Sequence, residues 1–472
     1  MRWKHRRHHR LSCESQDRFR RKDGYCMKSE KSQKEFPVEE LAEKYRTLLI
    51  STANALWEFH EPAYEEERSC ALLKQILTEH GFSVSVPCRE IPTAFTASFG
   101  KGKPVIGLLG EYDALVGLNQ AADETRQRCS EGESPDTPGH GCGHNLLGTG
   151  LLGAALFLKE MLESHHLPGT IVYFGCPAEE NASGKSNMIE HGFFEGVDAA
   201  FSWHPHAQAG IFNQSLANQR VVYTFHGTSA HASQAPHLGR SALDACELMN
   251  IGVNYLREHM IDEARIHYAY LDAGGKLPNI VPARAELLYA IRAPKGSQAQ
   301  ELRERTDRIA RGAALMTDTT VEIKTKCIYD SIMKNATLDE LLLKYMEVFL
   351  PIQYSEEELE YARGFLPYGN QSDSGIPIQS TPDLAPVRKT GISTDVGNVS
   401  QILPCSAFMV NCYANGSPLH HWTVTAQGKS SIAHKGMLAA SKILASCIWE
   451  IFTNPEILEK AKQDFWKEKQ KE

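Results

Sequence analysis

Hydrophobic residues recur at helical spacing near the start of the chain. The pattern predicts an amphipathic helix over about 37–59 and a second helix within 61–81, ending at a glycine. Short alternating segments at 82–86 and 94–100 predict strands. The uninterrupted apolar run 104–110 (PVIGLLG) predicts a buried strand of the parallel type.

Strand and helix patterns then alternate. After a polar, turn-rich segment at 119–138, a helix is predicted from about 145 to 164, and a strand from Gly169 towards Glu180. A short helix precedes the next strand, which ends in His204. This alternation predicts an α/β fold with a mostly parallel sheet. Ligands bind such sheets beyond the carboxyl ends of the strands.

The pattern changes between about 215 and 331. Its elements follow the order β-α-β-β-α-β, which predicts a ferredoxin-like unit inserted into the main domain, with an edge strand or outer helix face free for a partner. We therefore expect one domain built from 36–214 and 332–472 and a second from 215–331. Near the C-terminus a strand at 407–413 and a long helix at 430–453 are predicted, followed by a charged, solvated helix.

Charge divides the chain into a basic tail and an acidic body. Residues 1–22 carry nine Lys and Arg against Glu14 and Asp17, a balance of 9 − 2 = +7, so the remainder carries −8 − 7 = −15. An acidic body repels nucleic acid and anionic membranes, which argues against either as the main partner. Residues 1–35 are expected to be a disordered tail; a nuclear or nucleic-acid patch, an organellar transit peptide and a start at Met27 remain alternatives.

Composition is that of a soluble globular protein, with 42% apolar and 23% charged residues. No apolar stretch is expected to span a membrane, since the run 146–158 is interrupted by Thr149 and glycines. The twelve cysteines are scattered and form no CxxC pair, so a disulfide framework is not expected. A reducing, cytoplasmic location fits this usage.

The candidate chemistry begins at Cys142 and His144, which precede the helix at 145–164. Alternate residues of an extended backbone point the same way, so both side chains can reach one metal ion. A buried cysteine beside a surface histidine explains this pair alone equally well. Further metal-ligand types occur at strand ends and near the C-terminus, namely Glu180, His204 and either His420 or His421.

Five such ligands are too many for one catalytic zinc with an open position, but they suit two ions of Zn or Mn type that share a bridging ligand and a water. Glu180 would then bind metal, and Glu179 would hold the water and take its proton. The alternative is that these two glutamates form a solvated pair in a turn. Asp113 is expected to hydrogen-bond a ligand histidine or the backbone at the strand end rather than to bind metal.

Ordered motifs across about 38–453 resemble the amidohydrolase branch of the M20 peptidase family. They are GEYDAL, GHGCGHN, CPAEE, SWHP, GTSAHAS, GRSALDA, NIVPARAEL, STDVGN and LHHW. The resemblance implies a metallohydrolase domain with an inserted dimerisation or lid domain, present as a homodimer or heterodimer. It also implies hydrolysis of a small amide substrate: an N-acyl amino acid, p-aminobenzoyl-glutamate or a dipeptide. A non-catalytic subunit of a heteromeric amidohydrolase is the alternative.

The same resemblance implies a role for individual residues. Cys142 corresponds to the bridging ligand, Glu179 to the general base, and His231 to a donor that holds the carbonyl oxygen from the neighbouring subunit. Asn279 and Arg292 correspond to positions associated with the substrate carboxylate. The terminal metal ligands are expected to be His144, Glu180, His204 and, in preference to His421, His420. Every ligand and base position is filled, which favours the enzyme over the non-catalytic subunit.

Overall fold

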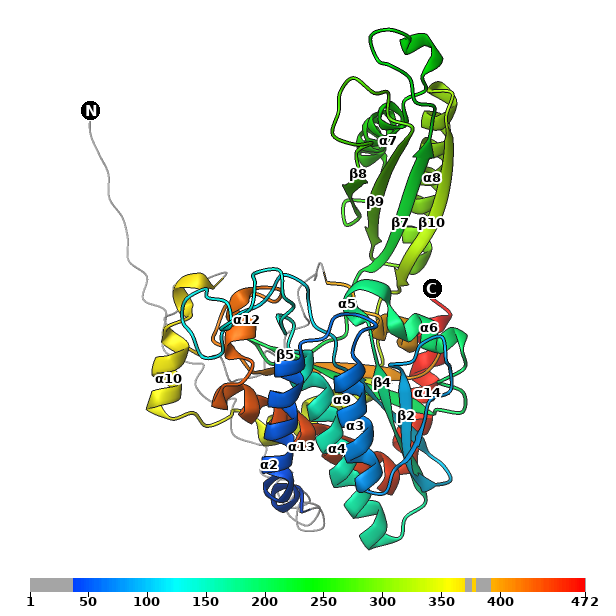
Figure 1. Cartoon of the computed structure of the whole chain (residues 1–472). Helices are drawn as coiled ribbons and strands as arrows, with labels where there is room; N and C mark the ends of the chain where they lie inside the picture. Colours follow the sequence, from blue (N-terminus) through cyan, green and yellow to red (C-terminus); the bar gives the residue numbers. More distant parts are fainter. Residues whose placement is uncertain (1–36, 370–375, 379–391, 472) are drawn as a thin grey trace, which may run out of the picture. The chain divides into compact units, whose positions relative to one another are not determined.

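In the described part of the chain, seven strands form the larger of two sheets, in the order β1-β2-β4-β3-β5-β11-β6. Figure 1 labels β2, β4 and β5 of this sheet. The computed structural model describes residues 37–369, 376–378 and 392–471, so the basic tail at 1–35 lies outside the described residues. The strands of this sheet are β1 (Ser83–Ser85), β2 (Phe95–Lys101), β3 (Val105–Glu111), β4 (Gly169–Cys176), β5 (Ala199–His206), β6 (Gly210–Ile211) and β11 (Cys405–Asn411).

The sheet is mixed, so the prediction of a mostly parallel sheet is corrected. The central pairs β4/β3, β3/β5 and β5/β11 are parallel. The pairs at both edges, β1/β2, β2/β4 and β11/β6, are antiparallel. Parallel neighbours require a long crossover connection. Only residues 102–104 connect β2 to β3, and only 207–209 connect β5 to β6, so the chain reverses direction at these two places.

Helices cover both faces of this sheet. Tyr173 of β4 donates its hydroxyl to the carbonyl of Gly148 in α4 (His144–His165), 3.1 Å away. The next residue, Phe174, points to the other face, where its ring stacks on Phe194 and packs with Val396 of α11 (Val396–Ser400). Further helices of the main part are α2 (Val38–Phe59), α3 (Glu67–Glu79), α6 (Gly184–Glu190), α9 (Ala336–Phe349), α12 (Trp422–Gln427) and α13 (Ser431–Thr453).

Within the described residues, two helices, α4 and α13, are long and apolar enough to cross a membrane by length and composition alone. By this test of length and composition, the sequence holds two candidates where none was expected. The most apolar 18-residue segment of α4 is 89% buried within the protein, and that of α13 is 78% buried. The two helices pack against each other and against the large sheet. Helices buried to this extent are typical of a protein core, where other parts of the protein cover their apolar surface.

The smaller sheet has four antiparallel strands in the order β10-β7-β9-β8. Along the chain the elements run strand, helix, strand, strand, helix, strand, and both helices pack on this sheet. They are β7 (Ala217–His226), α7 (Ala242–Leu256), β8 (Arg265–Asp272), β9 (Arg284–Ala293), α8 (Gly296–Met316) and β10 (Thr320–Tyr329). The division of the chain into domains stays a prediction.

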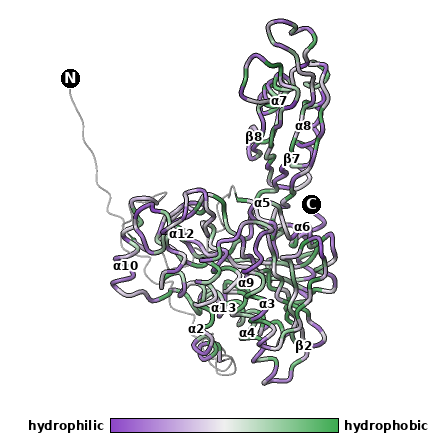
Figure 2. Tube along the Cα trace, viewed as in Figure 1, coloured by the Kyte–Doolittle hydropathy of each residue, from purple (hydrophilic) through white to green (hydrophobic). Residues whose placement is uncertain are grey.

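Two helices near the C-terminus differ from the sequence-based expectations. The sequence pattern does not predict α10 (Glu356–Arg363), whose residues are mainly hydrophilic (Figure 2). It begins instead at a capping box, in which Ser355 and Glu358 bond each other's backbone N–H. The final helix α14 (Pro455–Lys469), expected to be solvated, buries Leu458, Ala461 and Phe465 and packs on α9.

Candidate metal centre

The turn before α4 places Cys142 and His144 inside the protein, 7% and 1% exposed. Gly143 between them has φ +82°, and a Cβ there would lie 2.0 Å from the hydroxyl of Tyr413. A larger residue at this position would therefore clash as well as strain the backbone. The burial of both side chains excludes the alternative of a surface histidine.

Asp113 links two parts of the site. His144 donates its Nδ1–H to Asp113 Oδ1, 2.8 Å away, and the backbone N–H of Glu180 donates to Asp113 Oδ2, 3.0 Å away. The expectation that Asp113 hydrogen-bonds a ligand histidine is confirmed. A histidine that donates from Nδ1 presents Nε2 as its acceptor atom, which is the orientation a metal ligand needs.

Two groups of potential metal ligands share one sulfur atom. Cys142 lies with His144 and His204 in one group and with Glu180 and His420 in the other, and within each group the ligand atoms are within 4.8 Å of one another. Cys142 Sγ is 3.4 Å from His204 Nε2. Glu180 Oε2 is 3.3 Å from His420 Nε2, and Glu180 Oε1 is 4.0 Å from His144 Nε2. All five predicted ligands are thus brought together, with the cysteine at their centre.

The chemistry of these atoms fits divalent ions of Zn or Mn type. His144 Nε2 and Glu180 Oε1 are buried and have no hydrogen-bond partner among the described residues. Buried polar atoms of this kind call for a ligand. Burial and the nearby His144 lower the pKa of His204 to about 4, so this imidazole stays neutral, as a metal ligand must be.

The neighbouring carboxylate is held in its ionised form. Burial alone would raise the pKa of Glu180, but lowering interactions, the hydrogen bond from His420 foremost, outweigh burial and bring the pKa to about 2. An ionised carboxylate is the form that binds a metal ion.

His420, and not His421, faces this site. His421 is the N-cap of α12, where its Nδ1 accepts the backbone N–H of Thr423. The backbone N–H of His420 donates to the carbonyl of Gly141, 2.8 Å away, which ties its loop to the turn that carries Cys142. The preference for His420 as the last ligand therefore has a local cause, since the second histidine is used to begin a helix.

Glu179 and Glu180 form the first turn of the short helix α5 (Glu179–Ala182), directly after Ala178 with φ +57°. They are 7% and 8% exposed, so the alternative of a solvated pair is wrong. Glu179 lies in a further group with Glu111 and His144, whose ligand-type atoms are within 4.8 Å of one another. Burial and the charges of nearby carboxylates, Glu111 foremost, raise the pKa of Glu179 well above its usual range.

A buried ion triad lies behind Glu179. Lys185 Nζ is 2.5 Å from Glu111 Oε1 and 2.6 Å from Asp395 Oδ1, and its side chain is fully buried. Burial disfavours the charged lysine, but the two carboxylates hold its pKa well above the usual value. The remaining oxygen of Glu111 lies 3.4 Å from His144 Nε2. Sequence reasoning missed this triad: Glu111 and Asp395 belong to the motifs GEYDAL and STDVGN, but Lys185 belongs to none of the quoted motifs.

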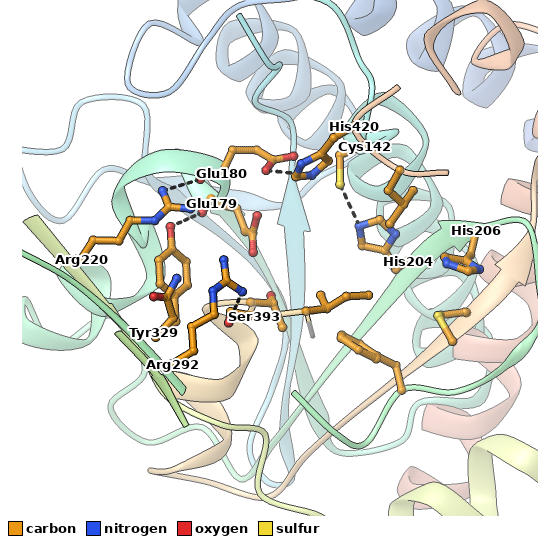
Figure 3. A pocket seen from close by; sticks show the side chains of 16 residues that line it. Cys142, Glu179, Glu180, His204, His206, Arg220, Arg292, Tyr329, Ser393 and His420 are labelled. Carbon is orange, nitrogen blue, oxygen red and sulfur yellow. Dashed lines mark hydrogen bonds and ion pairs between the residues drawn. The ribbon is translucent and has the colours of Figure 1, made fainter. Parts of the chain in front are cut away.

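The site opens into a cavity of about 340 Å³ (Figure 3). One part of its wall is formed by Glu179 and the candidate ligands Cys142, Glu180, His204 and His420, and another by β7, β9 and β10 of the smaller sheet. Tyr329 donates its hydroxyl to the carbonyl of Glu179, 2.9 Å away, and Arg220 donates to the carbonyl of Glu180, 3.2 Å away. Arg292 also lines the cavity and donates to Ser393 Oγ, 3.2 Å away.

His231 and Asn279 are not among the residues that line this cavity. They lie together elsewhere in the smaller sheet region, because His231 pairs with Ile280 and the N–H of Ala232 donates to the carbonyl of Asn279. His231 is exposed. The roles implied for these two residues stay predictions. Sequence reasoning also missed Asn218, Arg220 and Tyr329 in the cavity wall, because no motif marks them.

Comparisons with known proteins give relatives that cover most of this chain. One relative is a subunit of the p-aminobenzoyl-glutamate hydrolase of Escherichia coli. It is 42% identical over 455 residues, which cover 90% of this chain and 94% of the relative. The chain is also 29% identical to the Xaa-Arg dipeptidase of Mus musculus over 91% of this chain and 90% of the relative.

A solved structure shares the fold. It is a dinuclear metal-binding peptidase of the M20 family from Bacillus subtilis, with a TM-score of 0.58 and 18% identity over 87% of this chain and 99% of the other. Residues 107–420 match the peptidase family M20/M25/M40. The chain therefore belongs to this family and is an M20 amidohydrolase or peptidase.

Proposed function

We propose that the protein hydrolyses the amide bond of a small N-acyl amino acid or dipeptide, with p-aminobenzoyl-glutamate as the first substrate to test. The observation that carries this proposal is the sharing of Cys142 between two groups of metal ligands, with Glu179 beside them. The Escherichia coli relative, 42% identical, is named for hydrolysis of this compound, which supports the choice of substrate.

The cofactor is proposed to be a pair of divalent ions, Zn or Mn, with Cys142 as the shared ligand. His144 and His204 complete one group, and Glu180 and His420 the other. Ions bound there supply Lewis acidity for the scissile carbonyl and for a nucleophilic water. Asp113 orients His144 for this purpose through the Nδ1 hydrogen bond.

Glu179 acts as the proton carrier of the reaction. As the water oxygen attacks the carbonyl carbon, the Glu179 carboxylate takes the water proton and then gives it to the amide nitrogen as the C–N bond breaks. The products are a carboxylic acid and an amine. Arg292 in the cavity wall holds the carboxylate of the amino acid by charge and hydrogen bonds. His231 is proposed to donate to the developing oxyanion of a neighbouring subunit.

The proposed assembly is a dimer formed through the smaller sheet, with either a second copy or a homologue. Its edge strand β8 is largely exposed and carries the apolar side chains Tyr268, Tyr270 and Leu271. An unpaired strand edge is a template for pairing with another chain. The name of the Escherichia coli relative, which describes it as one subunit of an enzyme, is compatible with a heteromer. The protein is proposed to act in the cytoplasm, since the ten cysteines in the described part of the chain are free thiols.

The experiment combines metal analysis with turnover. The protein, loaded with Zn or Mn, is expected to release p-aminobenzoate from p-aminobenzoyl-glutamate and to lose this activity on exhaustive chelation. His420→Ala is expected to lower bound metal and activity together. His421→Ala is the matched control, since this neighbour caps α12 and should leave the metal content unchanged. Turnover that survives chelation contradicts the metal mechanism, and metal binding without any amide hydrolysis supports the non-catalytic alternative.

A further inference from the structure

Asn218 is a buried polar residue without a partner in the wall of the cavity. Its side chain is 1% exposed, and neither Oδ1 nor Nδ2 has a hydrogen-bond partner among the described residues. An unsatisfied buried carboxamide is costly and rare in folded proteins. Since Asn218 lines the cavity, a bound molecule can supply the missing partner.

The strands of the smaller sheet surround Asn218 with further hydrogen-bond donors. Asn218 of β7 lies directly opposite Arg292 of β9 and Tyr329 of β10. Arg220 lies two residues further along β7 and therefore points to the same face of the sheet. Its guanidinium packs over the ring of Tyr329, 5.5 Å from the ring centroid. In Figure 3 the guanidinium groups of Arg220 and Arg292 both point into the cavity near Glu179.

Most of the hydrogen-bond donors of Arg220 are not used by the described residues. Within the described residues its one hydrogen bond is to the backbone carbonyl of Glu180, which uses one of five guanidinium N–H groups. No carboxylate of the described chain forms an ion pair with it, whereas the exposed Arg284 pairs with two. A half-buried guanidinium without an anionic partner, next to an unpartnered carboxamide, is suited to bind an anion.

We propose that Asn218 and Arg220 form a subsite for a side-chain carboxylate of the substrate's leaving amino acid. This inference rests on the proposed function and specifies its substrate class. Arg292, already assigned to the amino acid's main carboxylate, lies directly across from Asn218 and diagonally from Arg220, so two carboxylates on one small molecule can be held by neighbouring side chains. The subsite selects amides of glutamate or aspartate over those of leucine or arginine.

Each of the two residues contributes a different interaction. Arg220 supplies a positive charge and a two-pronged donor. Asn218 adds the Nδ2 donor, and its Oδ1 stays available for a water molecule or an N–H of the same ligand. A substrate with a hydrocarbon side chain in this subsite leaves the Asn218 carboxamide buried and unpaired. A substrate with a cationic side chain is repelled by the positive charge of Arg220. Selectivity therefore comes from rejecting the wrong group as well as from binding the right one.

Binding measurements test this inference separately from turnover. In a Glu179→Gln background, which prevents proton transfer, calorimetry compares p-aminobenzoyl-glutamate, p-aminobenzoyl-leucine and p-aminobenzoyl-arginine on the full-length chain. Asn218→Leu, nearly isosteric, is expected to weaken binding of the glutamate compound about tenfold to a hundredfold. It should change binding of the leucine compound less than about threefold. Equal losses for all three compounds, or none, would overturn the subsite.

Two further variants keep the test decisive. Asn218→Asp preserves the shape but replaces the donor with a negative charge, so it is expected to reduce binding of the glutamate compound and to favour the arginine compound. Gln219→Leu is the matched control, because Gln219 points to the opposite face and bonds Gln300 instead. Its ligand preference should equal that of the parent. If the wild-type chain hydrolyses none of the three compounds yet Asn218→Asp still inverts the binding preference, the proposed function fails and the subsite stands.

Discussion

His144 donates its Nδ1–H to Asp113 Oδ1 over 2.8 Å, while the other oxygen of the same carboxylate accepts the backbone N–H of Glu180 over 3.0 Å. One buried carboxylate thus sets the direction of one candidate ligand and the backbone position of another. Because Asp113 follows closely after the buried strand β3, this arrangement is anchored in the core of the large sheet.

Asp113→Ala is expected to lower metal affinity about tenfold to a hundredfold, because losing the partner of a ligand histidine frees its ring and its tautomer. Asp113→Asn should have a smaller effect, since its single oxygen can replace only one of the two acceptors. Titration with Zn or Mn, followed by elemental analysis, measures both variants. Unchanged affinity in Asp113→Ala would show that the hydrogen bond does not orient a metal ligand.

Removal of the ligands themselves is expected to act more strongly. Cys142→Ala and His144→Ala should each lower bound metal, and Cys142→Ala should affect both ions, because its sulfur belongs to both groups of ligands. Elemental analysis of the purified variants measures the remaining metal per chain. Cys246→Ala, at a buried cysteine in the core of the smaller sheet and outside both ligand groups, is the control for loss of a thiol. Loss of only one ion in Cys142→Ala would contradict a shared ligand.

Glu179→Gln is expected to retain metal and fold, because the amide has nearly the same shape as the carboxylate. Hydrolysis should fall by several orders of magnitude, since the amide cannot accept the water proton. Steady-state kinetics and metal content measured on the same preparation check both expectations. Turnover close to that of the wild type would remove Glu179 from the role of general base.

Buried histidines are expected to make the fold sensitive to acid. Burial, aided by the charge of Lys429, lowers the pKa of His434 to about 4 from the usual 6.5. Between these values the unfolded chain binds a proton that the folded chain does not, so the free energy of unfolding falls as the pH drops from about 6.5 to about 4. The shift corresponds to about 3 kcal/mol.

The His434→Gln variant tests this pH dependence. Chemical denaturation at several pH values is expected to show a shallower loss of stability for the variant than for the wild type. His259→Gln, at an exposed position, should keep the slope of the wild type. Equal slopes in all three proteins would mean that His434 is not the group that takes up the proton.

The candidate ligands could be predicted because their chemistry is visible in the sequence. Cysteine, histidine and carboxylate residues at the ends of predicted strands or at helix starts are unusual enough to stand out, and the ordered motifs indicated a role for each. The prediction of the local structure was less accurate, because Glu179 and Glu180 begin a helix instead of ending a strand. Both still reach the cavity, because residues of one helical turn after a sharp bend can face the same side.

The cavity wall could not be predicted, because it depends on contacts between segments far apart in the chain. Asn218 and Arg220 follow the alternating pattern of an ordinary strand, and that pattern says which face a side chain occupies but not what lies opposite. Lys185 was equally hidden, since a lysine in a polar segment is usually exposed. Its burial follows from two carboxylates, one in β3 and one just before α11, that meet only in the folded protein.

The last prediction concerns His231, which does not line the cavity of its own chain. If two chains pair through their smaller sheets, His231 of one chain can donate to the oxyanion formed in the other. Removal of one such donor typically lowers kcat about 10²–10³-fold. His231→Ala should therefore lower kcat while the metal content stays unchanged. Mixed dimers of His231→Ala and Glu179→Gln should regain activity, because one of their two sites combines an intact base with an intact donor from the partner. Co-expression with two different tags isolates the mixed dimer for assay, and dimers of each single variant serve as controls. A mixed dimer as inactive as its parents would show that His231 does not act across an interface.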